Sequence, residues 1–343
     1  MSETRAKASG RLAIRELPPD DVIFGFSEAM NDVRRLATKV AAANIPILIQ
    51  GEGGSGKELI ARWIHSRSNY RAGEFVKINC AAIPGTLFES ELFGYEQGAF
   101  TGALSTKPGR VELAHDGTLF LDEIAGLEMG IQGKVLHFLQ DGCFSRIGGN
   151  FERAVNTRLI CSTQKNLGDE VDAKLFRADL FYRINVVRLR LPSLRERRQD
   201  IPILAEHFRA YHARQFGKEC ESLHATIVQR LKDAPWPGNI RELSNLVARY
   251  VLIGPEALTA SEISMRSSPI SIDEAKAPLK RVIKDVILKT ERNVIMETLR
   301  ANHWNRRKTA QALKISYRAL IYKIRAAGLA TDPVLPGAQG EKL

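Results

Sequence analysis

The sequence is poor in cysteine and in long apolar runs. Its four cysteines, Cys80, Cys143, Cys161 and Cys220, lie far apart and form no Cys-x-x-Cys pair. Zinc sites and a disulfide framework are therefore excluded as organising features, and reduced cytosolic thiols fit best. The chain has no run of about 18 apolar residues, and residues 1–11 are polar and charged, so we expect neither a membrane span nor export.

Length and charge indicate several domains, one of them basic. A chain of 343 residues exceeds what a single hydrophobic core usually organises. The net charge of +11 is concentrated in residues 276–325, where 14 Lys and Arg stand against three acids, so the rest balances at 36 against 36. Such a run is often only a solvated face, but clustering on one small domain is also what phosphate binding needs.

Alternating patterns predict an α/β domain followed by helical ones. Helical patterns separate five short apolar runs, which we expect to be strands of a parallel sheet covered on both faces: 45–49, 75–78, 118–121, 158–161 and 186–191. Helical periodicity follows at 201–216, 223–231 and 240–253. We expect a tail (1–21), an α/β subdomain (22–191), a helical subdomain (192–263), a linker (264–279), a basic helical domain (280–330) and a second tail (331–343).

A glycine-rich loop directly after the first expected strand matches the phosphate-binding pattern G-x-x-x-x-G-K. Its glycines let backbone N–H groups turn toward phosphates, the next helix offers its positive N-terminus, and the lysine would meet the β- and γ-oxygens. A glycine-rich turn without a nucleotide is the alternative. The pattern departs at its last position, where Ser or Thr would normally ligate magnesium. The expected nucleotide-binding residues are Gly51, Glu52, Gly53, Gly54, Ser55, Gly56, Lys57 and Glu58.

Two adjacent acids, Asp122 and Glu123, end the apolar run at 118–121. A buried strand delivers carboxylates to the carboxyl edge of a parallel sheet, where nucleotides bind. Asp122 could then hold magnesium or its water, while Glu123 polarises the attacking water. Solvated strand ends are the simpler alternative, and the loop upstream favours catalysis.

One hexapeptide is demanded neither by core packing nor by nucleotide binding: Gly98, Ala99, Phe100, Thr101, Gly102 and Ala103. It resembles the GAFTGA loop of the sigma-54-dependent activators, a branch of the AAA+ ATPases. The resemblance runs from residue 23 to about residue 253, including Glu-Leu-Phe-Gly at 91–94 and Trp-Pro-Gly-Asn-Ile-Arg-Glu-Leu at 236–243. It implies an AAA+ P-loop parallel sheet with a helical lid, and glutamate after the P-loop lysine is usual in that family.

Further roles follow only from this resemblance. Asn79 looks like the switch residue that holds the catalytic Glu123 until the nucleotide state changes. Arg177 and Arg183 resemble arginine fingers that enter a neighbouring subunit's site, although isolated arginines usually form only weak surface pairs. Arg241 resembles the sensor II arginine of the lid.

The sensor I position departs from the family pattern. The family's Ala-Thr-Asn is here Ser162, Thr163 and Gln164, so an extra methylene separates the side-chain amide of Gln164 from the backbone. The resemblance implies that Thr163 contacts the nucleotide.

In the hexapeptide, Phe100 and Thr101 would lie at the tip of a loop. An exposed aromatic residue there fits a contact to the sigma factor.

The basic domain resembles a Fis-type helix-turn-helix. Residues 291–301 and 305–324 suggest three helices with a small apolar core, and Ser316 can cap the last one. A bundle that binds protein is the alternative, but the localised charge favours double-stranded DNA. The expected DNA-binding residues are Arg306, Arg307, Lys308, Tyr317, Arg318, Tyr322, Lys323 and Arg325.

The resemblance implies an ATPase that uses ATP and Mg2+ in a hexameric ring. It would bind an upstream activating sequence and remodel sigma-54 RNA polymerase holoenzyme into the open complex, in the bacterial cytoplasm and on the nucleoid. Because the segment before the ATPase is short, we expect no receiver domain and control by a partner protein in trans, by expression level or through the ATPase surface. A repressor that retains the ATPase fold and a metabolic P-loop kinase are the competing hypotheses.

Overall fold

The computed structural model describes residues 17–255, 298–299, 305–313 and 315–326. These residues divide between two units, residues 1–267 and residues 268–343. Within the described ranges, no helix is both long and apolar enough to cross a membrane.

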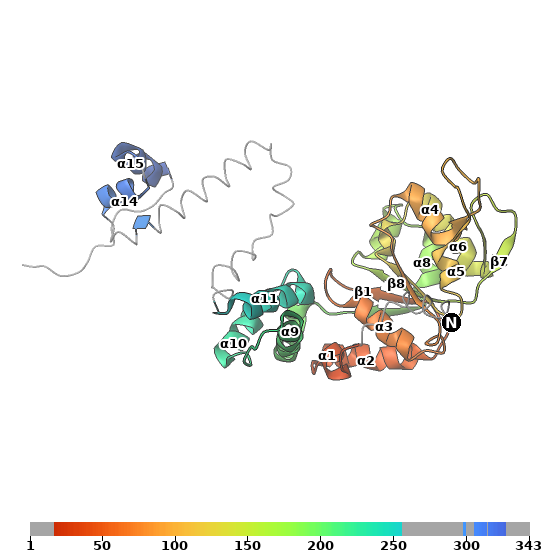
Figure 1. Cartoon of the computed structure of the whole chain (residues 1–343), viewed down its shortest axis with the longest axis horizontal. Coiled ribbons are helices and arrows are strands. Elements are labelled where there is room, and N and C mark those ends of the chain that lie inside the picture. The colour runs from red at the N-terminus through yellow and green to blue at the C-terminus, as the bar shows by residue number, and fades with distance from the viewer. Residues whose placement is uncertain (1–16, 256–297, 300–304, 314, 327–343) are drawn as a thin grey trace, which may run out of the picture. The chain divides into compact units, whose positions relative to one another are not determined.

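Five parallel strands form the central sheet of the first unit (Figure 1). Their order is β2-β5-β8-β1-β9. All five runs expected as strands are confirmed: β1 (Ile47–Gln50), β2 (Phe75–Asn79), β5 (Thr118–Asp122), β8 (Arg158–Thr163) and β9 (Val187–Arg190). β1 begins after Pro46 because proline has no N–H to donate to a neighbouring strand.

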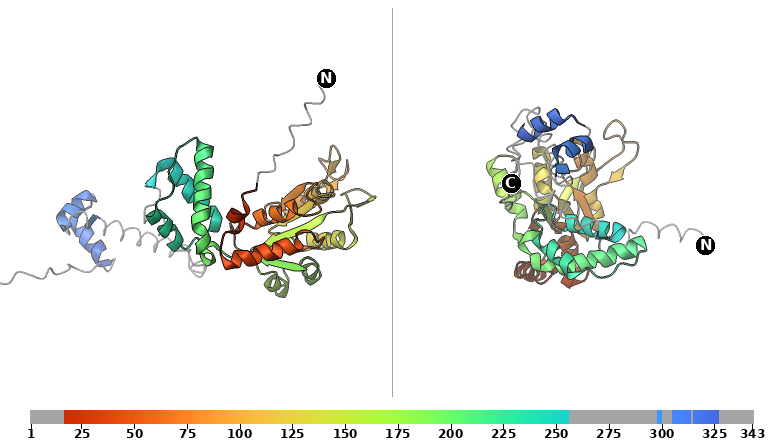
Figure 2. Two further views of the ribbon diagram at one scale, coloured as in Figure 1. Left: turned by 90° about the horizontal axis from the view of Figure 1, so that it is seen from below. Right: turned by 90° about the vertical axis from the view of Figure 1, so that its left-hand side faces the viewer.

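Alternate strand residues face opposite helical layers. Ile47 and Ile49 of β1 pack in one core with α1 (Asp20–Phe24), α2 (Glu28–Ala41) and α3 (Lys57–Ser66), whereas Leu48 packs in the core on the other face. That face is covered by α4 (Gly85–Phe93), α5 (Arg110–Leu113), α6 (Met129–Asp141), α7 (Leu167–Asp172) and α8 (Ala178–Ile184), as Figures 1 and 2 show. The inner strands β1, β5 and β8 are buried on both faces, as is typical of a parallel sheet, whereas the edge strands β2 and β9 alternate between more and less buried residues.

Two basic side chains are buried on the α2–α3 side. Arg158 donates hydrogen bonds to the carbonyls of Ala41 and Val40, which satisfies the end of α2, where carbonyl groups otherwise lack partners. The ring nitrogen Nδ1 of His65 lies 2.8 Å from the Thr118 hydroxyl. Burial, together with the positive charges of Arg158 and Arg62, lowers the pKa of His65 to about 4.

Three helices form the lid: α9 (Ile201–Phe216), α10 (Ala225–Asp233) and α11 (Asn239–Ile253). They enclose a separate core that contains Leu204, Leu231, Trp236 and Leu243. The three helices expected after residue 200 are therefore confirmed. Trp236 also donates its indole N–H to the Leu231 carbonyl at 2.7 Å, which fixes the turn between α10 and α11.

The buried carboxylate of Asp200, directly before α9, joins the lid to the start of the α/β subdomain. It accepts hydrogen bonds from the amides of Phe26 and Ser27 at 2.7 and 2.8 Å, and from the Ser27 hydroxyl at 2.6 Å. A Cβ on Gly25 would lie 2.2 Å from this carboxyl group. Only glycine therefore fits beside the carboxylate.

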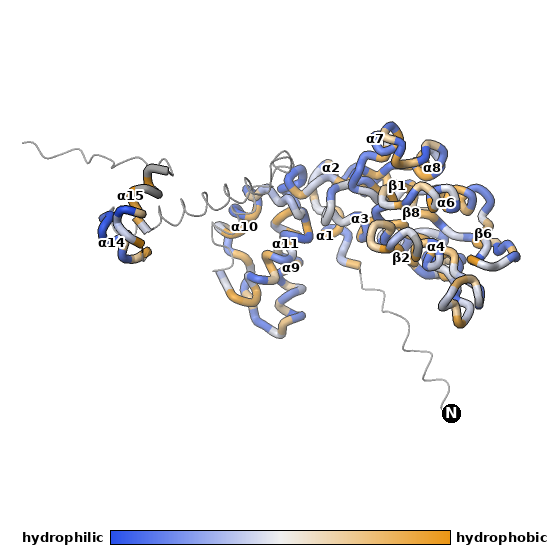
Figure 3. The backbone as a smooth tube through the Cα atoms, turned by 90° about the horizontal axis from the view of Figure 1, so that it is seen from above, coloured by the Kyte–Doolittle hydropathy of each residue, from blue (hydrophilic) through white to orange (hydrophobic). Residues whose placement is uncertain are grey.

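The second unit contains α14 (Arg306–Ala312) and α15 (Tyr317–Ala326) around Leu299, Ala310, Leu320 and Ile324. The Ser316 hydroxyl accepts a hydrogen bond from the Ala319 amide at 3.2 Å, so the expected cap is confirmed. Asn305 caps α14 in the same way. Figure 3 shows that α14 is largely hydrophilic. Most of the helix expected at 291–301 lies outside the described residues.

Candidate active site

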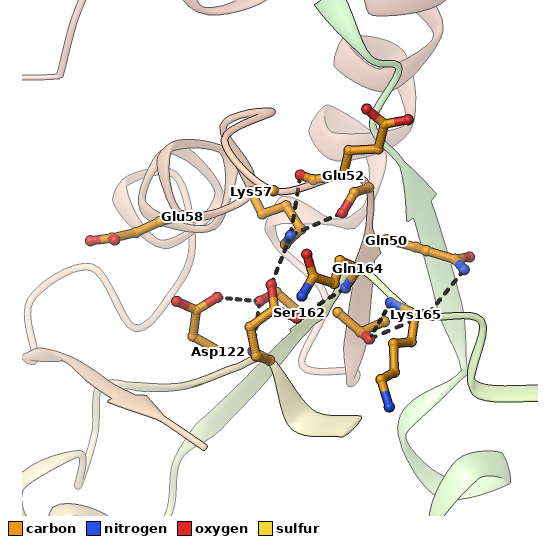
Figure 4. Close-up of polar contacts among 12 residues, drawn as sticks. Gln50, Glu52, Lys57, Glu58, Asp122, Ser162, Gln164 and Lys165 are labelled. Atoms are coloured by element: carbon orange, nitrogen blue, oxygen red, sulfur yellow. Dashed lines mark hydrogen bonds and ion pairs between the residues drawn. The ribbon is translucent and has the colours of Figure 1, made fainter. Parts of the chain in front are cut away.

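The P-loop connects β1 to α3, and its lysine is almost fully buried. Lys57 is 7% exposed, and its ammonium group donates to the carbonyls of Gly51 at 2.9 Å and Glu52 at 3.3 Å. The same group forms an ion pair with Glu123 Oε1 at 3.0 Å. Figure 4 shows Lys57 turned back into the loop. The structure thus brings together the two residues that the sequence placed on either side of the γ-phosphate.

Glu123 and Asp122 leave the end of β5 in different directions. Glu123 has a left-handed backbone (φ 55°), and its second carboxylate oxygen accepts a hydrogen bond from the backbone N–H of Gln164 at 3.1 Å. Asp122 Oδ1 accepts a hydrogen bond from the Ser162 hydroxyl at 2.5 Å, and its Oδ2 lies 3.0 Å from the Lys77 ammonium. The strained backbone at Glu123 is typical of functional positions.

The side chain of Glu58 does not contact that of Lys57 but forms ion pairs with two other basic residues. It extends away from Lys57 (Figure 4) and forms ion pairs with Lys77 at 2.7 Å and Arg62 at 2.8 Å. Partial burial raises the pKa of Glu58, but these hydrogen bonds outweigh burial and hold the pKa below its usual value. Burial lowers the pKa of Lys77, and its bonds to Glu58 and Asp122 raise it by more. Both groups are therefore charged at neutral pH.

The lid contacts the P-loop directly. Asn239, fully buried with a left-handed backbone, donates to the Glu52 carboxylate at 3.0 Å and to the Gly53 carbonyl at 3.1 Å. A Cβ on Gly54 would lie 2.5 Å from the Gly238 carbonyl oxygen. Arg241 lies in the first turn of α11, and its Cβ would lie 3.1 Å from the same Cβ on Gly54. Movement of the lid therefore acts on the P-loop backbone.

Two arginines before α9 also contact the P-loop. Arg195 pairs with the Glu52 carboxylate, where one hydrogen bond measures 2.9 Å. Arg197, 2% exposed, donates to the Ser55 carbonyl at 2.7 Å, and burial lowers its pKa to about 10. Since that value lies well above neutrality, a buried positive charge lies beside the loop that was expected to bind phosphates.

The remaining residues expected at the site have local partners. The Asn79 side-chain oxygen accepts a hydrogen bond from the Ala81 amide at 3.0 Å, while Glu123 is held by Lys57. Thr163 is buried and bonded to the backbone of Lys165. Arg177 pairs with Asp179 at 2.7 Å, and Arg183 donates to the Leu139 carbonyl at the same distance. The expected roles of these residues remain predictions.

The hexapeptide loop, residues 98–103, lies between β3 (Gly94–Tyr95) and β4 (Lys107–Pro108). Gly98 and Gly102 have φ values of 82° and 107°, and a Cβ on either would meet nothing within 4 Å. The Gly98 amide donates to the Ala103 carbonyl at 3.0 Å, which closes the loop at its base. Phe100 remains 45% exposed, and the one aromatic ring that it contacts in the described part of the chain is that of Tyr95.

A second hairpin, β6 (Cys143–Ser145) with β7 (Glu152–Ala154), lies beside the hexapeptide loop (Figure 1). Glu96 at the base of the loop forms ion pairs with Arg146 at 3.1 Å and Arg153 at 3.3 Å. Gly148 is so close to Ala99 that a Cβ would lie 2.7 Å from the alanine Cβ. The hairpin therefore supports the base of the loop and leaves the tip free.

In the second unit, α14 and α15 carry the residues expected at DNA. Arg307, Lys308 and Arg318 are exposed, and Tyr317 is 48% exposed; Arg306 is half-buried. Tyr322, Lys323 and Arg325 lie on α15, but their side chains fall outside what the structure describes.

Sequence reasoning missed Lys77, Ser162, Asn239, Arg195 and Arg197. A charged residue inside the apolar run at 75–78 was the available signal for Lys77. Asn239 stood within the motif at 236–243, from which only Arg241 was assigned a role. The contacts of the other three residues depend on chain segments far apart in the sequence, so local patterns carried no signal for them.

The parallel sheet, P-loop, strand-end acids and lid define an AAA+ ATPase. Three family models match the chain: "Sigma-54 interaction domain" at residues 23–190, "AAA+ ATPase lid domain" at 195–278 and "Bacterial regulatory protein, Fis family" at 288–326. The chain belongs to the sigma-54-dependent transcriptional activators. The resemblance inferred from the hexapeptide is therefore confirmed.

Individual proteins with similar sequences or structures support the same family. The chain is 40% identical to the response regulator protein PilR of Pseudomonas aeruginosa, over 92% of this chain and 71% of that protein. It is 43% identical to the regulatory protein AtoC of Escherichia coli, over 91% and 68%. A crystal structure of NtrX from Brucella abortus in complex with ATP superposes with a TM-score of 0.66 at 34% identity, covering 89% of this chain and 69% of that one.

Proposed function

We propose that this chain binds and hydrolyses ATP with Mg2+ in an oligomeric ring and uses the cycle to open sigma-54 RNA polymerase at promoters whose upstream sequences it binds. The nucleotide part is supported by the P-loop geometry and by the ATP complex of NtrX. The promoter part is supported by the family models for sigma-54 interaction and for Fis-type regulators.

In the proposed reaction, phosphate oxygens replace Glu123 as the partner of Lys57. The two groups lie 3.0 Å apart, so negative charge arriving at Lys57 would release the carboxylate to orient the attacking water. Asn79 and the exposed Arg177 and Arg183 would act after this exchange, the first as a switch and the others in a neighbouring subunit's site. Arg241 and Thr163 would report the nucleotide state from the lid and from β8.

The residues present fit Mg2+ bound together with a nucleotide. Among the described residues, no group of three or more acidic, histidine or cysteine side chains could hold a metal. Mg2+ commonly uses one or two carboxylates and completes its shell with water and substrate phosphates. Asp122, at the end of β5, would supply the protein oxygen, and the ion would neutralise charge on the transferred phosphoryl group.

The second unit would anchor the ring to double-stranded DNA. Arg307, Lys308 and Arg318 are exposed on α14 and α15, which is the pairing of helices that contacts backbone and major groove in helix-turn-helix proteins. Such a protein would act in the bacterial cytoplasm, on the nucleoid. Control by a partner protein remains part of the proposal.

The observation that carries the proposal is the exposed hexapeptide loop. Its base is fixed to the hairpin of β6 and β7, and its two glycines have open space around them. No hydrogen bond or ion pair between described residues joins its tip to the nucleotide residues. A loop that hydrolysis does not need, and that presents an aromatic side chain to solvent, fits an element that contacts a protein partner.

The test separates output from chemistry. Thr101→Ala and Phe100→Ala should leave ATP turnover and DNA binding near wild type but abolish capture of sigma-54 in the presence of ADP-aluminium fluoride, and with it open-complex formation. Ser105→Ala, an exposed change just outside the hexapeptide, is the matched control and should retain all four activities. All assays use one preparation of each variant, so that misfolding cannot imitate uncoupling.

Two outcomes would contradict the proposal. The loop variants could open sigma-54 promoters at the full rate, or the wild-type protein could fail to engage sigma-54 at all. Either result would favour a DNA-binding repressor that retains the ATPase fold.

A further inference from the structure

Lys77 is a charged residue in the middle of β2, where its strand neighbours Val76 and Ile78 are buried in the core. Its ammonium group lies between two carboxylates, 2.7 Å from Glu58 Oε2 and 3.0 Å from Asp122 Oδ2. Glu58 has a second partner in Arg62 at 2.8 Å. Among the residues that the structure describes, Asp122 has only the Ser162 hydroxyl on its other oxygen. Lys77 is therefore the only cation with a contact to Asp122 within the described residues.

We propose that Lys77 is a positioning residue that occupies the second oxygen of Asp122 in the nucleotide-free protein, so that a divalent cation enters the site only together with a nucleotide. This inference rests on the proposed nucleotide site and adds that Lys77 hinders the binding of a divalent cation to that site when no nucleotide is present. It concerns the order of binding, which the residues expected from sequence do not determine.

The physical basis is competition for one oxygen. Ser162 holds Oδ1 and Lys77 holds Oδ2, so a metal ion must displace the ammonium group and also meets its positive charge. A metal ion alone gains too few ligands to offset that cost, because it takes only one carboxylate from the protein. A nucleotide supplies both further oxygens and negative charge.

Glu58 gives the displaced lysine a place to remain. Its carboxylate keeps Lys77 paired at 2.7 Å when the Asp122 contact is broken, so the ammonium group loses one of two partners instead of both. A hydroxyl residue at this position could ligate a metal but could not hold the lysine as an ion pair. The departure of Glu58 from the general P-loop pattern therefore has a function in this chain.

The first experiment measures Mn2+ binding to the nucleotide-free full-length chain by the loss of the free-ion EPR signal. Lys77→Met should bind Mn2+ at least about tenfold more tightly than wild type, because one competing charge is removed. Adding Asp122→Asn to that variant should abolish the gain. Lys165→Met is the matched control, since Lys165 lies near the site, two residues after the end of β8, but pairs with Glu170 at 3.0 Å.

The second experiment titrates Mg2+ while fluorescent mant-ATP binding is recorded. Lys77→Met should reach half-maximal binding at a lower Mg2+ concentration, whereas Lys77→Arg, which keeps a cation, should behave like wild type. Thermal unfolding of every variant establishes that each is folded, and Lys77→Gln replaces Lys77→Met if the latter is not.

Two results would overturn the inference. Equal Mn2+ affinity of Lys77→Met and wild type would show that Lys77 does not compete with a metal ion for Asp122. Weaker mant-ATP binding by Lys77→Met at saturating Mg2+ would show that Lys77 contacts phosphate instead. Failure of the wild-type protein to bind mant-ATP would contradict the proposed function, and the Mn2+ measurement would still decide the role of Lys77.

Discussion

Two loops of the α/β subdomain contain glycine, with four glycines in residues 51–56 and two in residues 98–103, but the loops are held very differently. In the P-loop, a Cβ on Gly54 would lie 2.5 Å from a lid carbonyl, and Asn239, Arg195 and Arg197 all bond to the loop. In the hexapeptide loop, neither glycine has an atom within 4 Å of such a Cβ, and Phe100 is partly exposed. Glycine serves close approach in the first loop and freedom of movement in the second.

This difference separates the chemistry from its output. Lid, strand and helix all restrain the P-loop, so its geometry is set before a ligand arrives. The hexapeptide loop is fixed only at its base, by the Gly98 to Ala103 hydrogen bond and the Glu96 ion pairs. Changes in the first loop should therefore alter both stability and nucleotide chemistry, whereas changes in the second should leave nucleotide chemistry intact and cost less stability.

The largest expected effect is on hydrolysis. Glu123→Gln keeps the size of the side chain but removes its ability to accept a proton from water, so ATP turnover should fall by about 10²–10⁴-fold. Binding of mant-ATP should persist, whereas Lys57→Ala should lose it. Turnover is measured by phosphate release and binding by fluorescence. Equal loss of nucleotide affinity in both variants would contradict the separate roles.

The next effect compares the two loops directly. Gly54→Ala combines backbone strain at φ 75° with a clash against the Gly238 carbonyl, and should lower the free energy of unfolding by about 3 kcal/mol. Gly98→Ala has a similar φ of 82° but open space, and should cost only about 1–2 kcal/mol. Chemical denaturation of both variants measures the difference. Equal losses would mean that the lid does not restrain the P-loop.

A smaller effect should appear with pH. The pKa of His65 is about 4 in the folded protein, below its usual 6.5, so the unfolded chain binds more protons between these values. The stability contributed by neutral His65 is present above pH 6.5 and is lost as pH falls toward 4, and about 2 kcal/mol of it is lost between pH 7.5 and pH 5.

Denaturation at pH 7.5 and pH 5 measures this loss. His65→Gln, which cannot titrate, should be less sensitive to pH than wild type, and Ser105→Ala near the hexapeptide loop should match wild type. An unchanged pH dependence in His65→Gln would assign the loss to carboxylates.

The smallest effect concerns the exposed edge of the P-loop. Arg195 and Glu52 are 44% and 43% exposed, so solvent screens their ion pair and Arg195→Ala should cost about 1 kcal/mol or less. Asn239→Ala is the buried counterpart, and it should cost more because it leaves the Leu194 amide without its acceptor. Denaturation of the two variants gives the ranking, and a reversed order would place the main lid contact at Arg195.

Local patterns in the sequence were sufficient for much of the fold. The five strands could be predicted because β1, β5 and β8 are buried on both faces and because β2 and β9 keep apolar residues at alternate positions. The cap at Ser316 follows from its side chain. The meeting of Lys57 with Glu123 could also be predicted, since both leave the carboxyl edge of one parallel sheet.

The contacts around the nucleotide residues could not be predicted in this way. The ion pair of Lys77 with Asp122 depends on the register of β2 against β5, and Asn239 reaches Glu52 across 187 positions of the chain. Asn79 was expected to hold Glu123, but its side chain accepts the Ala81 amide. Which of two nearby partners an amide takes depends on the bound state, and a sequence does not specify that.

The hydrogen bonds of Asp200 mean that the lid, as defined by its helices, does not contain all the residues that stabilise it. Phe26 and Ser27 lie at the start of the α/β subdomain, yet within the described part of the chain they supply all three side-chain hydrogen bonds that Asp200 receives from outside the lid. An isolated lid fragment would carry a buried carboxylate without those donors, which is a costly arrangement. The lid therefore inherits part of its stability from the first turn of the ATPase, and a fragment designed from helix boundaries alone would lose it.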